Sequence, residues 1–247
     1  MLYPSKLIEG RLIRRYKRFL ADVIVSGEKM TVHCPNTGSM SGLLEEGNPV
    51  LISGPHNPKR KYLYTLEQIR IKRPDGRRIW VGVNTAVPNR VVSEAVSEKL
   101  LPGLEGYSSF RSEVSIGDHS RIDLLLDSDN LQPCWIEVKN VTMVLPNPNV
   151  KSNFNEGNFA CFPDAVTTRG RKHLQVLCDQ IDEGDRAMMV YVVQRSDGEI
   201  FAPASGFDPE YADELKGSVD RGLEVLAVQA NVTPKAVKIF QTIPVRN

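Results

Sequence analysis

The sequence predicts a two-domain protein of combined α+β and α/β class, in which a small all-β domain over residues 1–82 precedes a mixed α/β domain over residues 83–247. Turn residues divide the first third of the chain at the short spacing of antiparallel strands. The remainder alternates amphipathic helical patterns with apolar runs, as in a sheet covered by helices. The charge also divides here: residues 1–82 contain 15 Lys and Arg against 7 Asp and Glu, although the whole chain has a net charge of only +1.

Short strands account for the first domain. About five of them within some eighty residues fit a small Greek-key barrel; the OB-fold is the commonest such barrel that binds nucleic acid, and an SH3-like barrel fits nearly as well. The expected strands are a pair or one bent strand over LIEGRLIRRYKRFLADVIV, then strands near 30–33, 49–53, 62–72 and 78–83.

The second domain begins with a predicted helix that follows Pro88-Asn89 and closes at Pro102-Gly103. A mixed sheet covered on both faces is expected from the order of the elements that follow. These are strands at 110–116, 121–126, 134–140, 186–194 and 224–230, with helices at 169–183 and 209–222.

Composition excludes several classes of protein. The apolar fraction of 41% and the charged fraction of 25% are those of an ordinary globular protein. No stretch approaches the ~20 continuous apolar residues of a membrane helix, and the N-terminus lacks the pattern of a secretory signal, so we expect a cytoplasmic protein. The four cysteines form no C-x-x-C pair, which argues against disulfides and a zinc site.

Three charged residues lie within two of the predicted strands. Asp123 interrupts the run Ile-Asp-Leu-Leu-Leu, and Glu137 and Lys139 stand two apart in Ile-Glu-Val-Lys. Residues two apart on a strand leave the same face, and a carboxylate within a buried strand is costly unless it is compensated. Two carboxylates and a lysine at strand positions form a site that binds a divalent cation and positions a water, as in the D…(E)xK nuclease core.

We therefore predict a Mg²⁺ or Mn²⁺ site for phosphodiester hydrolysis, with Asp123, Glu137 and Lys139 as catalytic residues and the two carboxylates as metal ligands. The alternative is a buried ion pair that fixes strand register, with Arg121 as a further candidate partner; such pairs stabilise little. The net negative charge of the three residues favours the metal site. Further candidates are the carbonyl of Val138, Glu94 as an extra metal ligand, Glu113 as a second choice, and Gln194 for the attacking water or a phosphate.

Basic residues interleaved with aromatic ones predict a nucleic-acid surface on the first domain. Cations neutralise phosphates and release counterions, while aromatic rings stack on bases. The alternative is a solvated basic face, with Tyr16, Phe19 and Tyr64 in the core. The cations expected to bind nucleic acid are Arg14, Arg15, Lys17, Arg18, Lys59, Arg60 and Lys61.

The segment FPDAVTTRGRKHL predicts a helix N-terminus surrounded by cations. Thr167 and Thr168 are candidate caps, and Arg169 and Lys172 are expected to bind phosphate there. A purely structural helix start is an equally good interpretation. The segment HCPNTGSMSG resembles an anion-binding loop, but it lacks the P-loop pattern, so nucleotide binding is not supported.

Taken together, RYKRFLADV, HCPNTGSM, NPKRKYLYT, VGVNT, SRIDLLL, IEVKNVT, FPDAVTTRGRKHL and VVQRSD make the chain resemble the sugar fermentation stimulation protein (SfsA) family over nearly its whole length. The resemblance implies an N-terminal OB-like domain and a C-terminal domain similar to the PD-(D/E)xK nucleases. It also implies non-specific DNA binding and a role in regulating sugar (maltose) metabolism. The nuclease-like site falls on Asp123, Glu137 and Lys139, with Glu94 as a further member.

The expected function is therefore DNA binding by the basic barrel against a metal-dependent, nuclease-like domain. Two alternatives stay open at this stage. One is a purely regulatory DNA-binding protein with a catalytically silent nuclease scaffold. The other is an RNA-processing nuclease, because barrels of this kind also hold single-stranded RNA.

Overall fold

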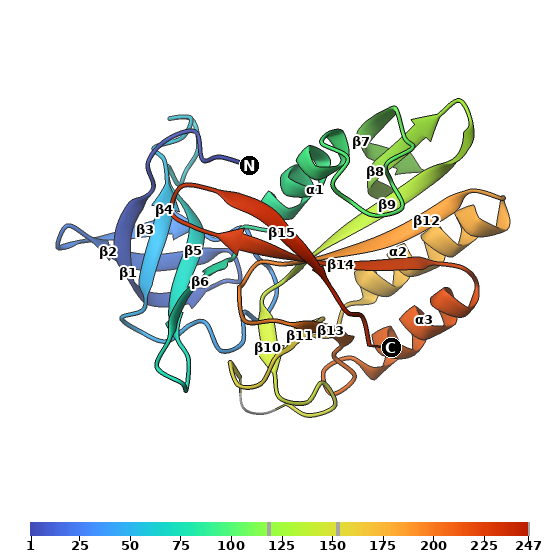
Figure 1. Cartoon of the computed structure of the whole chain (residues 1–247). Helices are drawn as coiled ribbons and strands as arrows, with labels where there is room; N and C mark the ends of the chain where they lie inside the picture. Colours follow the sequence, from blue (N-terminus) through green and yellow to red (C-terminus); the bar gives the residue numbers. More distant parts are fainter. Residues whose placement is uncertain (118–119, 152–153, 247) are drawn as a thin grey trace.

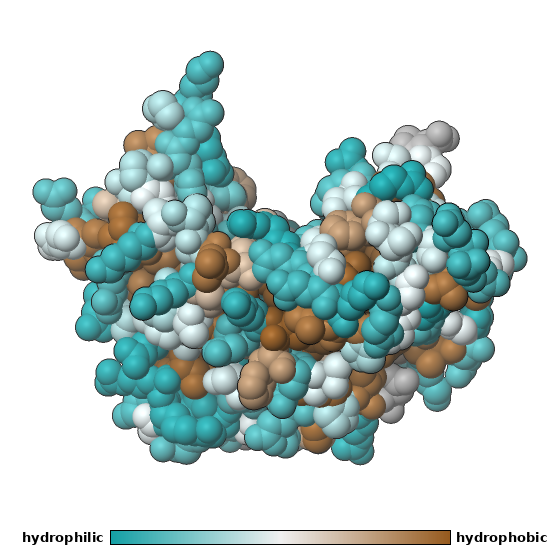
Figure 2. All heavy atoms as spheres, turned by 45° about the horizontal axis from the view of Figure 1, so that its top comes forward, coloured by the Kyte–Doolittle hydropathy of each residue, from teal (hydrophilic) through white to brown (hydrophobic). Residues whose placement is uncertain are grey.

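Two domains of different architecture lie side by side in the computed structural model, which describes residues 1–117, 120–151 and 154–246 (Figure 1). The first is built on one six-stranded sheet. The second has a larger six-stranded sheet, a three-stranded sheet and three helices. The face in Figure 2 is hollowed between two projections that carry mostly hydrophilic residues.

The first domain is a curled antiparallel sheet in the order β3-β2-β1-β4-β5-β6. One residue pair, His33–Thr65, also joins β3 to β5, so the sheet curls back on itself without a full ladder to close it. The segment predicted as a pair or one bent strand is a pair, β1 and β2, joined by the turn Lys17–Phe19. The strands are β1 (Ile8–Tyr16), β2 (Leu20–Val25), β3 (Glu28–His33), β4 (Pro49–Ser53), β5 (Thr65–Lys72) and β6 (Arg78–Gly82).

The second domain is organised by a mixed sheet in the order β15-β14-β12-β9-β8-β7. Its centre is parallel, because β12 pairs in parallel with both β9 and β14, and its flanks are antiparallel. The strands are β7 (Ser109–Ile116), β8 (Ser120–Ser128), β9 (Leu131–Val141), β12 (Arg186–Val193), β14 (Glu224–Val232) and β15 (Val237–Ile243).

Helices cover both faces of this sheet, as the sequence predicts (Figure 1). Helix α1 (Val87–Ser97) packs its valines on one face, beside Leu124 and Ile136. Helices α2 (Thr168–Asp182) and α3 (Pro209–Asp220) cover the other face, where Leu174 and Leu177 meet the apolar run of β12. The buried apolar residues form one core on each side.

A small third sheet is absent from the sequence-based expectation. It consists of β10 (Met143–Leu145), β11 (Phe159–Phe162) and β13 (Ile200–Pro203). Strands of three and four residues carry too few alternations for their pattern to be recognised. This sheet places the segment after Phe162 beside the end of β9.

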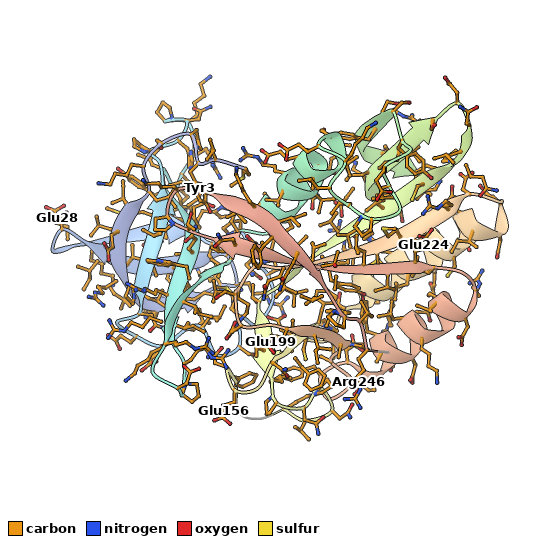
Figure 3. The ribbon with its side chains drawn as sticks, viewed as in Figure 1. Tyr3, Glu28, Glu156, Glu199, Glu224 and Arg246 are labelled. Carbon is orange, nitrogen blue, oxygen red and sulfur yellow. The ribbon has the colours of Figure 1, made fainter. Side chains whose placement is uncertain are left out.

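The two domains are tied together by polar contacts. Gln68 of β5 donates to the hydroxyl of Tyr3 and to the carbonyl of Thr233, and Tyr3 lies where the two sheets meet (Figure 3). The first three residues pack on the second domain: Leu2 bridges to Ala236 and Met1 is part of the core around α1. None of the helices in the described part of the chain is both long and apolar enough to cross a membrane.

Candidate active site at the domain junction

Glu137, Lys139 and His173 form a compact charged group at the end of β9. Glu137 and Lys139 leave the same face of the strand, and the Lys139 ammonium donates to Glu137 Oε1 at 2.5 Å. His173, on the inner face of α2, contacts the same oxygen through Nδ1. Glu137 is only 3% exposed, so this carboxylate is compensated from two sides by donors of the chain itself.

The second oxygen of Glu137 is buried and has no hydrogen-bond partner among the residues that the structure describes. Burial tends to raise the pKa of this carboxyl, but the hydrogen bond from His173 and the charge of Lys139 outweigh it and hold the pKa below its ordinary value. The carboxylate therefore stays ionised with one free oxygen. A buried acceptor without a partner costs about 1–3 kcal/mol, so a cation at that oxygen would be stabilising.

Asp123 lies beside this group on β8. Its Oδ2 accepts the backbone N–H of Val138 at 2.7 Å, and its Oδ1 accepts the side-chain amide of Asn89 in α1 at 2.6 Å. Burial first, and then the negative charge of Glu137, raise the pKa of Asp123 to about 6. A carboxylate whose ionisation is disfavoured by burial and by a neighbouring carboxylate is in an environment that a divalent cation relieves.

Residues at the N-terminus of α2 hold His173 in position. Thr167 caps the helix by accepting the N–H of Gly170 at 3.0 Å, which agrees with the expected cap. Arg169 donates to His173 Nε2 at 3.4 Å, and this leaves Nδ1 to carry the proton towards Glu137. A chain of contacts therefore runs from Arg169 through His173 to Glu137.

Two cavities flank the charged group. The first, which we name the interdomain cavity, has a volume of about 600 Å³ and is lined by Arg15 and Arg18 from the first domain and by Lys139 and Arg169 from the second. The second, named the α2 cavity, has a volume of about 570 Å³ and lies between the β7–β8 end and the start of α2. Arg169 lines both cavities, Lys139 only the first and His173 only the second.

Four of the predicted nucleic-acid-binding cations line these cavities, namely Arg15, Arg18, Arg169 and Lys172. The others do not. Arg14 pairs with Asp22 on the first domain, and Lys17 lies in the turn after β1. Lys59, Arg60 and Lys61 form a separate exposed turn between β4 and β5.

Glu94, the predicted third ligand, is directed elsewhere. It pairs with the N-terminal ammonium of Met1, because Glu94 and Asn89 point to different sides of α1. Glu113 pairs with the exposed Arg121 at 3.8 Å, so Arg121 is not a partner of the Asp123–Glu137 pair. Within the described ranges no three His, Cys, Asp or Glu side chains gather as a metal-binding group.

Gln194 is fully buried at the junction of the domains. It donates to Asn140 Oδ1 at 2.9 Å, and its own Oε1 has no partner. Asn140 follows Lys139 and lines the interdomain cavity, so Gln194 reaches this cavity only through Asn140.

Sequence reasoning missed two contacts that shape the site. Asn89 was recognised only as a helix-start residue, although its amide holds Asp123. His173 was considered only as part of the helix-start segment FPDAVTTRGRKHL, whereas it contacts Glu137. A signal did exist for His173, because it stands four residues before Leu177 and so shares the inward face of α2.

The segment HCPNTGSMSG binds the carboxylate of another residue of the chain, Asp164. The N–H of Met40 and the hydroxyl of Ser39 donate to Asp164, to its carboxylate and its carbonyl respectively, both at 2.8 Å. A Cβ added at Gly38 would meet the Asp164 carboxylate at 2.6 Å. This contact closes one wall of the interdomain cavity. Phe19, which the alternative interpretation of the basic surface placed in the core, is 48% exposed in the turn after β1.

The fold and the site define a protein in which a curled β domain is fixed against an α/β domain, with paired carboxylates and a lysine at the junction. The family model of the SfsA N-terminal OB domain matches residues 13–83, and the model of the sugar fermentation stimulation protein RE domain matches residues 86–236. The chain therefore belongs to the sugar fermentation stimulation protein family.

Relatives support this assignment over the full length. The sugar fermentation stimulation protein homologues of Geotalea uraniireducens and Geobacter metallireducens are each 46% identical to the chain, over 100% of both chains in the first case and 99% of both in the second. The solved structure of Pyrococcus furiosus SfsA in complex with Ca²⁺ covers 100% of this chain and 98% of its own, with a TM-score of 0.85 at 22% identity. That likeness establishes a shared fold.

Proposed function

We propose that the protein binds nucleic acid between its two domains and hydrolyses a phosphodiester bond at a divalent-metal site formed by Asp123 and Glu137. The observation that carries the proposal is the buried, unpartnered Oε2 of Glu137 beside a second carboxylate whose pKa is raised to about 6. The arrangement corresponds to the PD-(D/E)xK nuclease core that the sequence pattern indicates. Lys139 supplies the third element of that core.

The residues present fit a divalent cation. Mg²⁺ is commonly held by one or two carboxylates, with waters and substrate phosphate completing its shell, so the two carboxylates and the carbonyl of Val138 form a sufficient set. Mg²⁺ or Mn²⁺ is the expected ion. When bound, such an ion lowers the pKa of a water and stabilises the charge on the reacting phosphate.

The side chains of the site have distinct roles in this proposal. Lys139 places a positive charge at the phosphate and orients the attacking water. Arg18 and Arg169 hold neighbouring phosphates, since both line the interdomain cavity. His173 keeps Glu137 ionised and in place through its contact with Oε1. Asn89 fixes Asp123 in the same way from α1.

Two similarities to known proteins support the proposal. The N-terminal match is to an OB domain, a fold that commonly holds nucleic acid, and the related Pyrococcus structure is of a Ca²⁺ complex. Non-specific DNA binding is proposed first and RNA second. A role in regulating sugar (maltose) metabolism, implied by the family resemblance, requires the binding step and not the cleavage step.

A second candidate function is regulatory DNA binding on a catalytically silent nuclease scaffold. One observation favours it: Lys139 and His173 both compensate Glu137, so the group needs no metal to remain folded. The two functions share the binding surface. They differ in whether phosphodiester bonds are cut.

Cleavage assays separate the two functions. Single- and double-stranded DNA and RNA, each labelled at one end, are incubated with the protein and Mg²⁺ or Mn²⁺, or with EDTA. We expect metal-dependent cutting that is lost in Asp123→Ala and Glu137→Ala. It should persist in the matched control Asp127→Ala, which removes a carboxylate near the other end of β8 that pairs with Arg111. Binding without cutting of any substrate would favour the silent scaffold.

A further inference from the structure

The two cavities beside Glu137 differ in the chemistry of their walls. The interdomain cavity combines its cations with apolar side chains, among them Met143, Phe162, Pro163 and Val166. Val166 is 69% exposed, which leaves its side chain available at the cavity wall. Among the described residues that line the α2 cavity there is no such wall, since all of them are polar or cationic except for a glycine.

This difference in wall chemistry indicates whether each cavity is suited to a duplex or to a single strand. A duplex offers a protein wall its phosphates, sugars and base edges, because its base faces are stacked inside the helix. A single strand offers base faces as well, and these bury against apolar or aromatic side chains beside a cationic track. The walls of the interdomain cavity match an unpaired base with its phosphate, whereas the α2 cavity matches a phosphate backbone alone.

The size and depth of the interdomain cavity also favour a single strand. A cavity of about 600 Å³ is within the range that holds one small organic ligand, and hence about one or two nucleotides. The contact of Asp164 with Ser39 and Met40 closes one wall between the domains. Glu137 is 3% exposed and is bonded to Lys139, which lines this cavity, so the reacting phosphate must reach Glu137 past Lys139. A flexible single strand can follow that path with less distortion than a stacked duplex.

We infer that the interdomain cavity seats an unpaired nucleotide, so that the substrate of the proposed site is a single strand. Its base packs against the wall formed by Val166 and Phe162, and its neighbouring phosphates pass Lys139 and Arg169 into the α2 cavity. The inference rests on the proposed function, because it takes the strand past the Asp123–Glu137 pair. DNA and RNA share the chemistry involved.

Binding measured without metal tests the inference independently of cleavage. Fluorescence anisotropy is recorded in EDTA at one salt concentration for labelled strands of about 12 nucleotides, as single-stranded DNA, single-stranded RNA and duplex DNA of the same sequence. We expect at least one of the single strands to bind about tenfold or more tightly than the duplex. Equal or tighter binding of the duplex would overturn the inference.

A matched pair of exposed valines tests where the base lies. Val166→Ser removes the apolar wall without adding charge and is expected to weaken single-strand binding about threefold while leaving duplex binding unchanged. Val150→Ser alters a valine that is 42% exposed and lines neither cavity, and it should change neither. If the two variants bind the single strand alike, the base does not enter the interdomain cavity and the inference fails.

The result of these binding tests can be distinguished from the result of the cleavage assays that test the proposed function. Single-strand preference together with no metal-dependent cutting would retain the inference and remove the nuclease. Cutting that depends on Asp123 and acts on duplex alone would retain the nuclease and remove the inference.

Discussion

The second domain contains two clusters of buried charge, and their carboxylates are hydrogen-bonded to different degrees. In the first, Asp197 accepts from Arg195 through both oxygens, at 2.6 and 2.7 Å, and also from Arg73 of the first domain. Arg195 donates further to the carbonyl of Thr142 at 2.7 Å. Burial tends to raise the pKa of Asp197, but the arginines outweigh it and hold the pKa below its ordinary value.

The second cluster contains Asp123, Glu137 and Lys139. Here two carboxylates face one lysine, one carboxylate oxygen has no partner, and burial with the charge of Glu137 raises the pKa of Asp123 to about 6. In the Asp197 cluster two arginines face one carboxylate, and both oxygens of that carboxylate are hydrogen-bonded. Among the described residues Nε of Arg73 has no hydrogen bond, but it lies 3.6 Å from the Asp75 carboxylate. The Asp123 cluster has an excess of negative charge that its own residues leave incomplete.

The difference separates a structural cluster from a candidate functional one. A saturated carboxylate between two arginines joins the domains and leaves no acceptor for a ligand. An ionised carboxylate with a free buried oxygen is a cost that folding alone does not explain. Strongly perturbed carboxylates beside a cavity are frequent at functional sites.

The largest expected effect on stability comes from the removal of the Asp197 carboxylate. Asp197→Ala leaves Arg195 and Arg73 buried without their partner, which costs about 3–5 kcal/mol. For a chain of this size the melting temperature should fall by about 10 °C. Thermal unfolding followed by circular dichroism measures the change. Asp182→Ala removes an exposed carboxylate paired with Arg221, and it should leave the melting temperature unchanged; equal effects would make the Asp197 cluster unimportant.

Asp123→Asn should increase the stability of the metal-free protein, in contrast to Asp197→Ala. Folding raises the pKa of Asp123 to about 6, from an unfolded-state value of about 4. The protonated carboxyl therefore contributes fully to stability below about pH 4, and this contribution is lost as the pH rises through about 6. Asparagine carries no charge and accepts from Val138, while Asn89 turns its amide to match. We expect about 1 kcal/mol of added stability at pH 7.

The pH dependence gives the control for that variant. Urea unfolding of wild type and Asp123→Asn, in EDTA, should show a stability gain that grows between pH 4 and pH 6 and is constant above. At pH 4 the gain should vanish. A gain that does not depend on pH would mean that removal of charge is not its cause.

Nucleic-acid binding should distinguish cations that line the cavities from those that do not. In Arg18→Gln/Arg169→Gln, two phosphate contacts are lost, so the slope of log affinity against log salt for a single strand should become shallower by about 1.4. Anisotropy titrations over a range of salt concentrations measure the slope. An unchanged slope would place the strand elsewhere.

The smallest effect is expected from the exposed turn between β4 and β5. Lys59→Gln/Arg60→Gln/Lys61→Gln removes three cations that line neither cavity, so a strand of about 12 nucleotides should keep its wild-type slope. A shallower slope in the same titrations would extend the binding surface over the first domain.

Much of the fold could be predicted because its strands and helices carry strong periodicity. Residues 187–193 are apolar throughout and form most of the central strand β12, and α2 begins where its threonines predict. The three short strands β10, β11 and β13 could not be predicted, since their pairing depends on contacts between distant segments.

The site was predictable only where its members are close in sequence. Glu137 and Lys139 meet because strand residues two apart share a face, and this geometry is local. The contacts of Glu137 with His173 and of Asp123 with Asn89 span 36 and 34 residues. They depend on how α1 and α2 pack against the sheet. Glu94 was misplaced for the same reason, because the position of Met1 beside α1 has no sequence signal.

Direct titration of a divalent cation tests the central claim. Isothermal titration calorimetry with Mn²⁺ is performed on wild type, Glu137→Gln and the control Glu224→Gln, whose carboxylate pairs with Arg186 at the start of β14 (Figure 3). The account predicts Mn²⁺ binding to wild type and to Glu224→Gln that is lost in Glu137→Gln. Binding of Mn²⁺ that is unchanged in Glu137→Gln, or no binding to wild type, would contradict it.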